Sequence, residues 1–174
     1  MSYEVGKQRT VLVVEDEPDI REVLVEYFRS RGYTVTGAAD GRSAIAALER
    51  GAFDLVLTDL QLPGVDGLAV LSAARRLYPS IYVIIVTGYA SLDSAIQAVR
   101  LGAYDYLTKP FSLGQIDVAL RRIDDRADLQ AENQRLTDLL ARQDGTDLRH
   151  AFLLRLEGIE NRLTRIEAAL RSRP

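Results

Sequence analysis

The chain is organised around the stretch DLVLTDLQLPG, at residues 54–64. Its first half is apolar and rich in branched side chains, which predicts a short buried strand. That strand ends on Asp59, and Pro63 and Gly64 mark a turn soon after it. An acidic side chain at the carboxyl end of a buried strand lies where open α/β sheets bind ligands. Taken alone, Asp59 is more often a solvated loop residue or a helix cap, so its role depends on the rest of the chain.

The composition is that of a globular domain with an additional segment. The chain has 174 residues, a net charge of -3 and no cysteine, which excludes disulfides and thiol chemistry. Its apolar runs reach only strand length, and residues 1–10 lack the apolar core of a signal peptide. We therefore expect a cytoplasmic protein with no membrane-spanning segment, and the mild acidity argues against binding to nucleic acid.

Four further strands are predicted, and helical patterns alternate with them. These strands cover residues 10–14, 33–36, 81–86 and 104–107. Strands of this continuous apolar type, separated by helices, are typical of a parallel sheet covered on both faces. The alternation of five strands with five helices therefore predicts an α/β fold with a doubly wound parallel sheet.

Polar residues gather where the predicted strands end. Because the carboxyl ends of parallel strands share one edge of the sheet, five of them should lie together there: Glu15, Asp16, Asp59, Thr87 and Lys109. Each has an ordinary explanation alone, as a helix-start acid, a cap or a solvated lysine. Together they favour one site, because crowded carboxylates suit Mg²⁺, a lysine and a hydroxyl can hold phosphoryl oxygens, and an aspartate can act as a nucleophile. The pattern indicates a site that accepts a phosphoryl group on Asp59.

Four motifs in fixed order carry a family resemblance: VLVVEDEPDIR, DLVLTDLQLPGVDG, VIIVTGYA and AYDYLTKPF. Over about residues 10–123 the chain resembles the receiver domain of two-component response regulators. The resemblance implies a flavodoxin-like sheet of strand order 2-1-3-4-5. It also implies that Asp59 takes its phosphoryl group from a histidine kinase or a phosphotransfer protein. Such a protein is not an enzyme for a second substrate, since it catalyses only its own aspartyl phosphorylation and dephosphorylation.

The resemblance also implies a set of ligands for Mg²⁺. Asp16 and Asp59 are its direct carboxylate ligands, and Glu15 acts through water. The main-chain carbonyl of Gln61 is the remaining protein ligand. The family more often has aspartate at the position of Glu15, whose additional methylene keeps the charge but shifts the metal geometry.

The remaining implied roles concern the phosphoryl group and its readout. Thr87 and Lys109 are implied to contact the phosphoryl oxygens, and Thr87 forms a switch pair with Tyr106. The alternative for Tyr106 is a half-buried aromatic on an edge strand with no switching role. The peptide bond between Lys109 and Pro110 is implied to be cis.

Residues 124–174 lie beyond the receiver pattern, and residues 1–9 form a short extension before it. The last receiver helix is predicted to continue to about residue 143, with a break at residues 144–147 and a second helix over residues 148–171. The heptad seam of the continued helix holds Leu129, Asn133, Leu136 and Leu140. The seam of the second helix holds Leu156, Ile159, Leu163, Ile166 and Leu170. Asparagine at position a favours dimers, whereas leucine at a with isoleucine at d favours tetramers. The alternative is a helical hairpin within one chain.

We therefore expect a response regulator whose output is a coiled-coil tail that forms homo-oligomers and can bind a downstream protein. Two alternatives remain: a constitutive scaffold, in which the receiver only docks, and a phosphate sink that drains a kinase. Residues 124–174 carry nine arginines against ten acidic residues, and no basic recognition helix is evident. This balance argues against DNA binding by the tail.

Overall fold

The computed structural model describes residues 9–142, which form alternating strands and helices. The strands are β1 (Thr10–Val14), β2 (Thr34–Ala38), β3 (Leu55–Asp59), β4 (Tyr82–Thr87) and β5 (Asp105–Thr108). The helices are α1 (Pro18–Ser30), α2 (Gly41–Arg50), α3 (Gly67–Leu77), α4 (Leu92–Arg100) and α5 (Leu113–Arg142). The second strand, expected at residues 33–36, extends to Ala38 because it pairs with β1 along the whole length of that strand.

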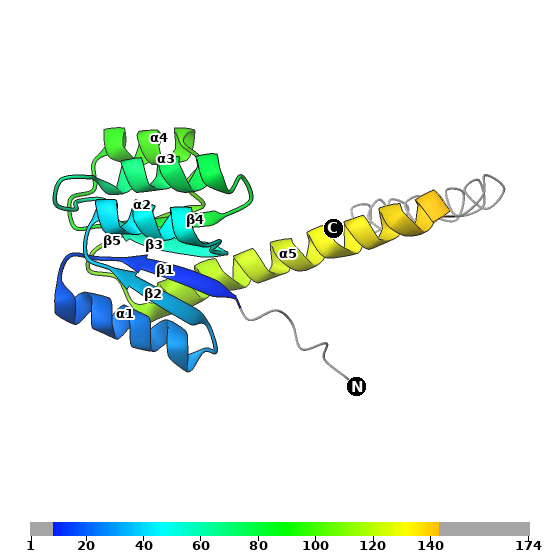
Figure 1. The fold of residues 1–174 in the computed structure, drawn as a ribbon, viewed down its shortest axis with the longest axis horizontal. Helices are drawn as coiled ribbons and strands as arrows, with labels where there is room; N and C mark the ends of the chain where they lie inside the picture. The colour runs from blue at the N-terminus through cyan, green and yellow to red at the C-terminus, as the bar shows by residue number, and fades with distance from the viewer. Residues whose placement is uncertain (1–8, 143–174) are drawn as a thin grey trace, which may run out of the picture. The chain divides into compact units, whose positions relative to one another are not determined.

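The strands form one sheet in the order β2-β1-β3-β4-β5, and every neighbouring pair is parallel. Helices α2, α3 and α4 cover one face, while α1 and the first turns of α5 cover the other (Figure 1). The predicted doubly wound α/β fold is therefore confirmed. The register pairs Asp59 with Val86 and Thr87 with Thr108, so the carboxyl ends of β3, β4 and β5 lie side by side.

The burial of each strand follows from its sequence. All five residues of β3 are buried, as are the last four of β1, because these strands lie inside the sheet with helices on both faces. The edge strand β2 has the sequence TVTGA and is mostly exposed, in keeping with its threonines and glycine. The apolar strands thus build the core, and their ends present polar residues at a common edge.

Side-chain caps fix where three helices begin. Asp40 accepts a hydrogen bond from the main-chain N–H of Ser43 at the start of α2, and Asp66 accepts one from Ala69 at the start of α3. Ser91 forms a reciprocal capping box with the third residue of α4. Such caps satisfy main-chain N–H groups that have no partner within the helix. They therefore fix the loops on the carboxyl edge of the sheet.

Gly67 allows a close approach between α3 and the end of β3. A Cβ atom on this residue would lie 2.1 Å from the main-chain carbonyl oxygen of Asp59. The Gly67 N–H also donates to the carbonyl of Leu60, at 2.9 Å. The loop after β3 and the start of α3 therefore pack tightly against Asp59.

The chain divides into two compact units, Met1–Leu120 and Arg121–Pro174. In the second unit the described residues continue helix α5, on which the Leu129 side chain is 65% exposed and Asn133 is also exposed. The side chain of Leu140, the predicted break and the second predicted helix lie outside the described residues: that helix carries Leu156, Ile159, Leu163, Ile166 and Leu170. The coiled coil stays a prediction. None of the helices within residues 9–142 is both long and apolar enough to cross a membrane.

Candidate functional site

Three carboxylates meet at the carboxyl edge of the sheet. Glu15 follows β1 directly, Asp16 comes next, and Asp59 is the last residue of β3. One carboxylate oxygen from each lies within 4.8 Å of the others. Glu15 and Asp59 are buried, at 1% and 7% exposure, whereas Asp16 is exposed. The structure thus brings together the three acids that the strand ends predicted.

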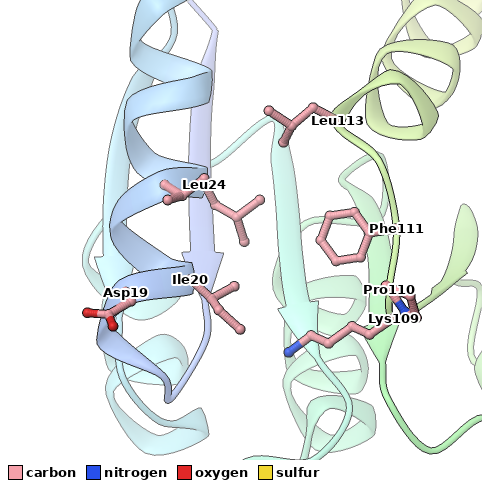
Figure 2. Close-up of a pocket in the computed structure, with 8 residues that line it drawn as sticks. Asp19, Ile20, Leu24, Lys109, Pro110, Phe111 and Leu113 are labelled. Carbon is pink, nitrogen blue, oxygen red and sulfur yellow. The ribbon is translucent and has the colours of Figure 1, made fainter.

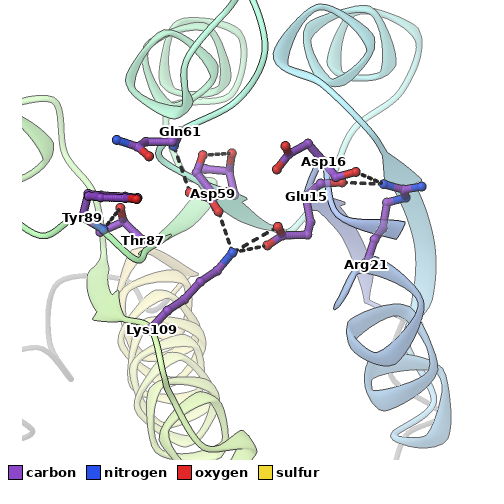
Figure 3. Close-up of polar contacts among 9 residues, drawn as sticks. Glu15, Asp16, Arg21, Asp59, Gln61, Thr87, Tyr89 and Lys109 are labelled. Carbon is purple, nitrogen blue, oxygen red and sulfur yellow. Dashed lines mark hydrogen bonds and ion pairs between the residues drawn. The ribbon is translucent and has the colours of Figure 1, made fainter. Parts of the chain in front are cut away.

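Lys109 enters this acidic cluster from the loop after β5. Its Nζ lies 2.6 Å from Asp59 Oδ2 and 2.8 Å from Glu15 Oε2, so it bridges the two buried acids (Figure 3). Burial acts to lower the pKa of this amine, but the hydrogen bonds to Asp59 and Glu15 outweigh burial, and the pKa is raised. Lys109 is therefore a fixed cation beside the carboxylates.

The surroundings of Glu15 raise the pKa of its carboxyl. Burial raises its pKa above 4.5, and the negative charges of Asp59 and Asp16 act in the same direction. The hydrogen bond and the positive charge of Lys109 act against this and do not cancel it. A divalent cation at the cluster would favour the charged form of Glu15 for the same electrostatic reason.

Both carboxylate oxygens of Asp59 have a protein partner. Oδ1 accepts the main-chain N–H of Gln61 at 2.9 Å, and Oδ2 accepts Lys109 Nζ. The side chain of Gln61 itself is exposed, so it is the backbone of this residue that orients Asp59. These two hydrogen bonds hold the carboxylate of Asp59 in one orientation.

Arg21 bonds the backbone of the loop that carries Glu15 and Asp16, and sequence reasoning missed this role. Its Nη1 donates to the main-chain carbonyl of Glu15 at 2.6 Å and to that of Asp16 at 3.2 Å. Arg21 lies in the first turns of α1 and ends the motif VLVVEDEPDIR, but its residue type does not indicate a contact with main-chain carbonyl groups. It holds the β1–α1 loop in the shape that presents both acids.

The two residues of the predicted switch pair have separate partners. Thr87 is fully buried, and its hydroxyl oxygen accepts the main-chain N–H of Tyr89 at 3.1 Å. Tyr106 is half-buried on β5 and packs against the core, with its hydroxyl 2.9 Å from Ser94 Oγ on α4. Sequence reasoning gave Ser94 no role. In this structure the Thr87 hydroxyl bonds the Tyr89 N–H and the Tyr106 hydroxyl contacts Ser94, so the switch pair stays a prediction.

An apolar groove of about 660 Å³ runs between α1 and the β5–α5 loop. In Figure 2, Ile20 and Leu24 of α1 face Phe111 and Leu113 across it, with Lys109 at one end. Asp19, Val23 and Pro110 complete its lining. The peptide bond between Lys109 and Pro110 is cis, as the resemblance implied.

Polar side chains also join α1 to α5. The Tyr27 hydroxyl donates to Asp117 Oδ1 at 2.6 Å, and Arg31 binds the same carboxylate through Nε and Nη2 at 3.0 and 3.1 Å. The guanidinium of Arg31 also lies over the ring of Tyr27, at 3.8 Å from its centre. Burial, followed by the bond to Asp117, raises the pKa of Tyr27, so this phenol stays neutral.

Comparison with known proteins identifies the family. Residues 11–121 match the family described as response regulator receiver domain, and the chain belongs to that family. It is 44% identical over 117 residues to the transcriptional activator protein PfeR of Pseudomonas aeruginosa, covering 65% of this chain and 38% of that protein. It is 40% identical over 116 residues to the transcriptional regulatory protein TcrA of Mycobacterium tuberculosis, covering 67% and 46% respectively.

The fold agrees with this assignment. A crystal structure of a CheY-like response regulator receiver domain protein from Methanospirillum hungatei JF-1 matches with a TM-score of 0.66 and 31% identity. The match covers 73% of this chain and 99% of that one. The matched part of the chain corresponds to less than half of the length of PfeR and of TcrA.

Glu15, Asp16 and Asp59 form the acidic cluster that is typical of the Mg²⁺ site in receiver domains. The donor set fits this ion, because all three side chains offer hard carboxylate oxygens within 4.8 Å of one another. A receiver domain also implies a histidine kinase as partner, since receivers act in two-component signalling.

Proposed function

We propose that the protein accepts a phosphoryl group on Asp59 and passes its phosphorylation state to a downstream protein. The observation that carries this proposal is the environment of Asp59. Its carboxylate is oriented by the N–H of Gln61, contacts Lys109 at 2.6 Å and lies beside two further acids. A nucleophile, a fixed cation and a place for a divalent ion are thus found at one point.

The reaction is a transfer from phosphohistidine to aspartate. An oxygen of Asp59 attacks phosphorus, the bond between phosphorus and the imidazole nitrogen breaks, and the released nitrogen pair completes a neutral imidazole. Lys109 already lies against Asp59 and offsets negative charge on the transferring oxygens. Asp16, Asp59 and the Gln61 main-chain carbonyl, with Glu15 nearby, would hold Mg²⁺, and the ion would further neutralise the charge on those oxygens.

The test is phosphorylation by the small donor acetyl phosphate. In Mg²⁺ the wild-type chain should gain the mass of one phosphoryl group, whereas Asp59→Asn and the wild-type chain in a chelator should not. Asp66→Asn is the matched control, because asparagine also caps helices well and Asp66 lies in the same loop. Equal labelling of Asp59→Asn and wild type would refute the proposal.

The same geometry suggests where a phosphodonor protein docks. The apolar groove between α1 and the β5–α5 loop ends at Lys109, which contacts Asp59. A protein that packs on this groove therefore brings its phosphohistidine beside Asp59. We place the donor there because an exposed apolar groove needs a partner surface and this one adjoins the reacting residue.

This docking proposal is tested with Val23→Asp, since Val23 lines the groove and is 55% exposed. Transfer from a phosphorylated histidine kinase that labels the wild-type chain should fall at least about tenfold, as a charge is placed in an apolar contact. Labelling by acetyl phosphate should not change. Leu92→Asp, at an exposed apolar position of α4, is the control and should behave as wild type with both donors.

For the output, we propose that residues 124–174 assemble copies of the chain. Support comes from the Leu129 side chain, which is 65% exposed on α5, and from the apolar heptad positions that follow it in sequence. Light scattering in Mg²⁺, with and without beryllofluoride, tests this. A change of mass supports a phosphorylation-dependent assembly, and an unchanged oligomer supports a constitutive scaffold. A monomer in both states refutes assembly, and rapid loss of the phosphoryl group from that monomer would favour the phosphate sink.

A further inference from the structure

Ser94 takes part both in the cap of α4 and in a contact with Tyr106 on β5. As the third residue of α4 it forms the reciprocal capping box with Ser91. Its hydroxyl also lies 2.9 Å from the hydroxyl of Tyr106 on β5, twelve residues away in sequence. One side chain therefore joins the start of a helix to an aromatic ring of a neighbouring strand.

The hydroxyl of Ser94 has more polar neighbours than it can satisfy. The N–H of Ser91 lies 3.2 Å away, the Ser91 hydroxyl 2.9 Å, the Ser91 carbonyl 3.0 Å, and the Tyr106 hydroxyl 2.9 Å. A serine hydroxyl can donate one hydrogen bond and accept two. The three contacts to Ser91 would use all of this capacity, so Tyr106 competes with the cap for Ser94.

We propose that Ser94 is a positioning residue that holds Tyr106 against α4. When Tyr106 moves away, the Ser94 hydroxyl forms all of its hydrogen bonds with Ser91 in the helix cap. The position of Tyr106 then determines the strength of the capping hydrogen bonds at the first turn of α4. This turn carries Leu92, whose apolar side chain is 77% exposed, so the coupling reaches a surface that a partner can contact.

The loop before α4 gives the coupling a link to the site. Thr87 ends β4, and only residues 88–90 separate it from Ser91. Among these, Gly88 has open space where a side chain would project, which leaves room for the loop to move. A shift of Thr87 would therefore act on the same turn that Ser94 and Tyr106 control. This link rests on the proposed phosphorylation of Asp59, which supplies the trigger.

The first experiment needs no phosphorylation. The ring signal of Tyr106 is followed by NMR in the full chain with labelled tyrosine, and its loss in Tyr106→Phe assigns it. Ser94→Ala should move this signal, Ser94→Thr should restore it, and Ser91→Ala should leave it in place because it removes the cap but keeps the partner of Tyr106. If Ser91→Ala moves the signal as far as Ser94→Ala does, or Ser94→Thr fails to restore it, the role of Ser94 is wrong.

The second readout is hydrogen exchange of the Ser91 amide, whose N–H donates to Ser94. Tyr106→Phe should slow this exchange by about fivefold, the effect of one hydrogen bond gained by the cap. Unchanged or faster exchange would refute the competition. The first experiment and this one concern the unphosphorylated protein, so they can fail while the proposed function stands.

The trigger is tested separately with Mg²⁺ and beryllofluoride. In the wild-type chain the ring signal of Tyr106 should shift, and in Ser94→Ala the untreated signal should already lie part of the way toward that position. Asp59→Asn should show no response. If the wild-type signal does not shift while acetyl phosphate labels Asp59, the link to phosphorylation is wrong. If labelling also fails, the proposed function is wrong.

Discussion

Replacing Gly67 with alanine tests how tightly the loop after β3 controls Asp59. A Cβ atom at this position would meet three main-chain atoms. They are the carbonyl oxygen of Asp59 at 2.1 Å, the carbonyl carbon of Asp59 at 2.9 Å and the Cα of Leu60 at 2.9 Å. No change of side-chain rotamer can relieve these contacts, because all three atoms belong to the backbone. Either α3 or the end of β3 must therefore move.

The structure sets the size of the effect. Ordinary contacts begin at 3.4 Å, so the approach of 2.1 Å requires a backbone shift of more than an ångström. The shift stretches or breaks the hydrogen bond from Gly67 N–H to the Leu60 carbonyl, worth about 1 kcal/mol. Strain from overpacking adds about 1–3 kcal/mol. We expect Gly67→Ala to lower the free energy of unfolding by about 3 kcal/mol.

Urea unfolding followed by circular dichroism measures this change, and acetyl phosphate labelling measures its effect on Asp59. Labelling should slow at least about tenfold, because the misplaced carboxylate no longer fits its partners. Gly88→Ala is the control, since nothing lies within 4 Å of the Cβ position there. The reasoning is refuted if Gly67→Ala unfolds within about 0.5 kcal/mol of wild type and labels at the same rate.

Two further predictions concern protonation and the polar contacts between α1 and α5. The pKa of Glu15 is raised above 4.5 by burial, so its protonated form persists to higher pH and competes with Mg²⁺. The affinity for Mg²⁺ should therefore be weaker at about pH 5 than at about pH 7, and equal affinities by calorimetry would contradict this assignment. Tyr27→Phe removes the 2.6 Å hydrogen bond to Asp117 while Arg31 keeps its own bonds to that carboxylate. The free energy of unfolding should fall by about 1 kcal/mol in urea titrations, and no measurable change would show that the phenol contributes nothing.

The parts of the molecule that sequence patterns could predict are those controlled by local physics. The continuous apolar runs before Glu15 and Asp59 gave the buried strands, because a strand with helices on both faces admits few polar residues. Parallel pairing then brings the strand ends to one edge, so Lys109 could be expected beside Asp59. Helix caps are local in the same way, because Asp40 and Ser91 each bond the main-chain N–H of a residue three positions further along the chain.

The contacts that sequence reasoning missed depend on how distant elements pack. Tyr27 and Asp117 are ninety residues apart, and nothing in either helix pattern indicates that they meet. Arg21 bonds main-chain carbonyl groups. Because every residue has such a carbonyl, the sequence does not show which ones accept a hydrogen bond. Ser94 was missed because a capping box is usually recognised by glutamate or glutamine at that position. Its contact with Tyr106 also requires knowing how α4 lies on the sheet.

Phosphorylation of Asp59 is tested by locating the phosphoryl group in the chain. After transfer from a phosphorylated histidine kinase in Mg²⁺, borohydride reduces an aspartyl phosphate to homoserine. The homoserine then marks the residue that was phosphorylated. Peptide mass spectrometry should then find homoserine at position 59 and aspartate at positions 16 and 66. Homoserine at another position, or a labelled chain that keeps aspartate at position 59, would contradict the account.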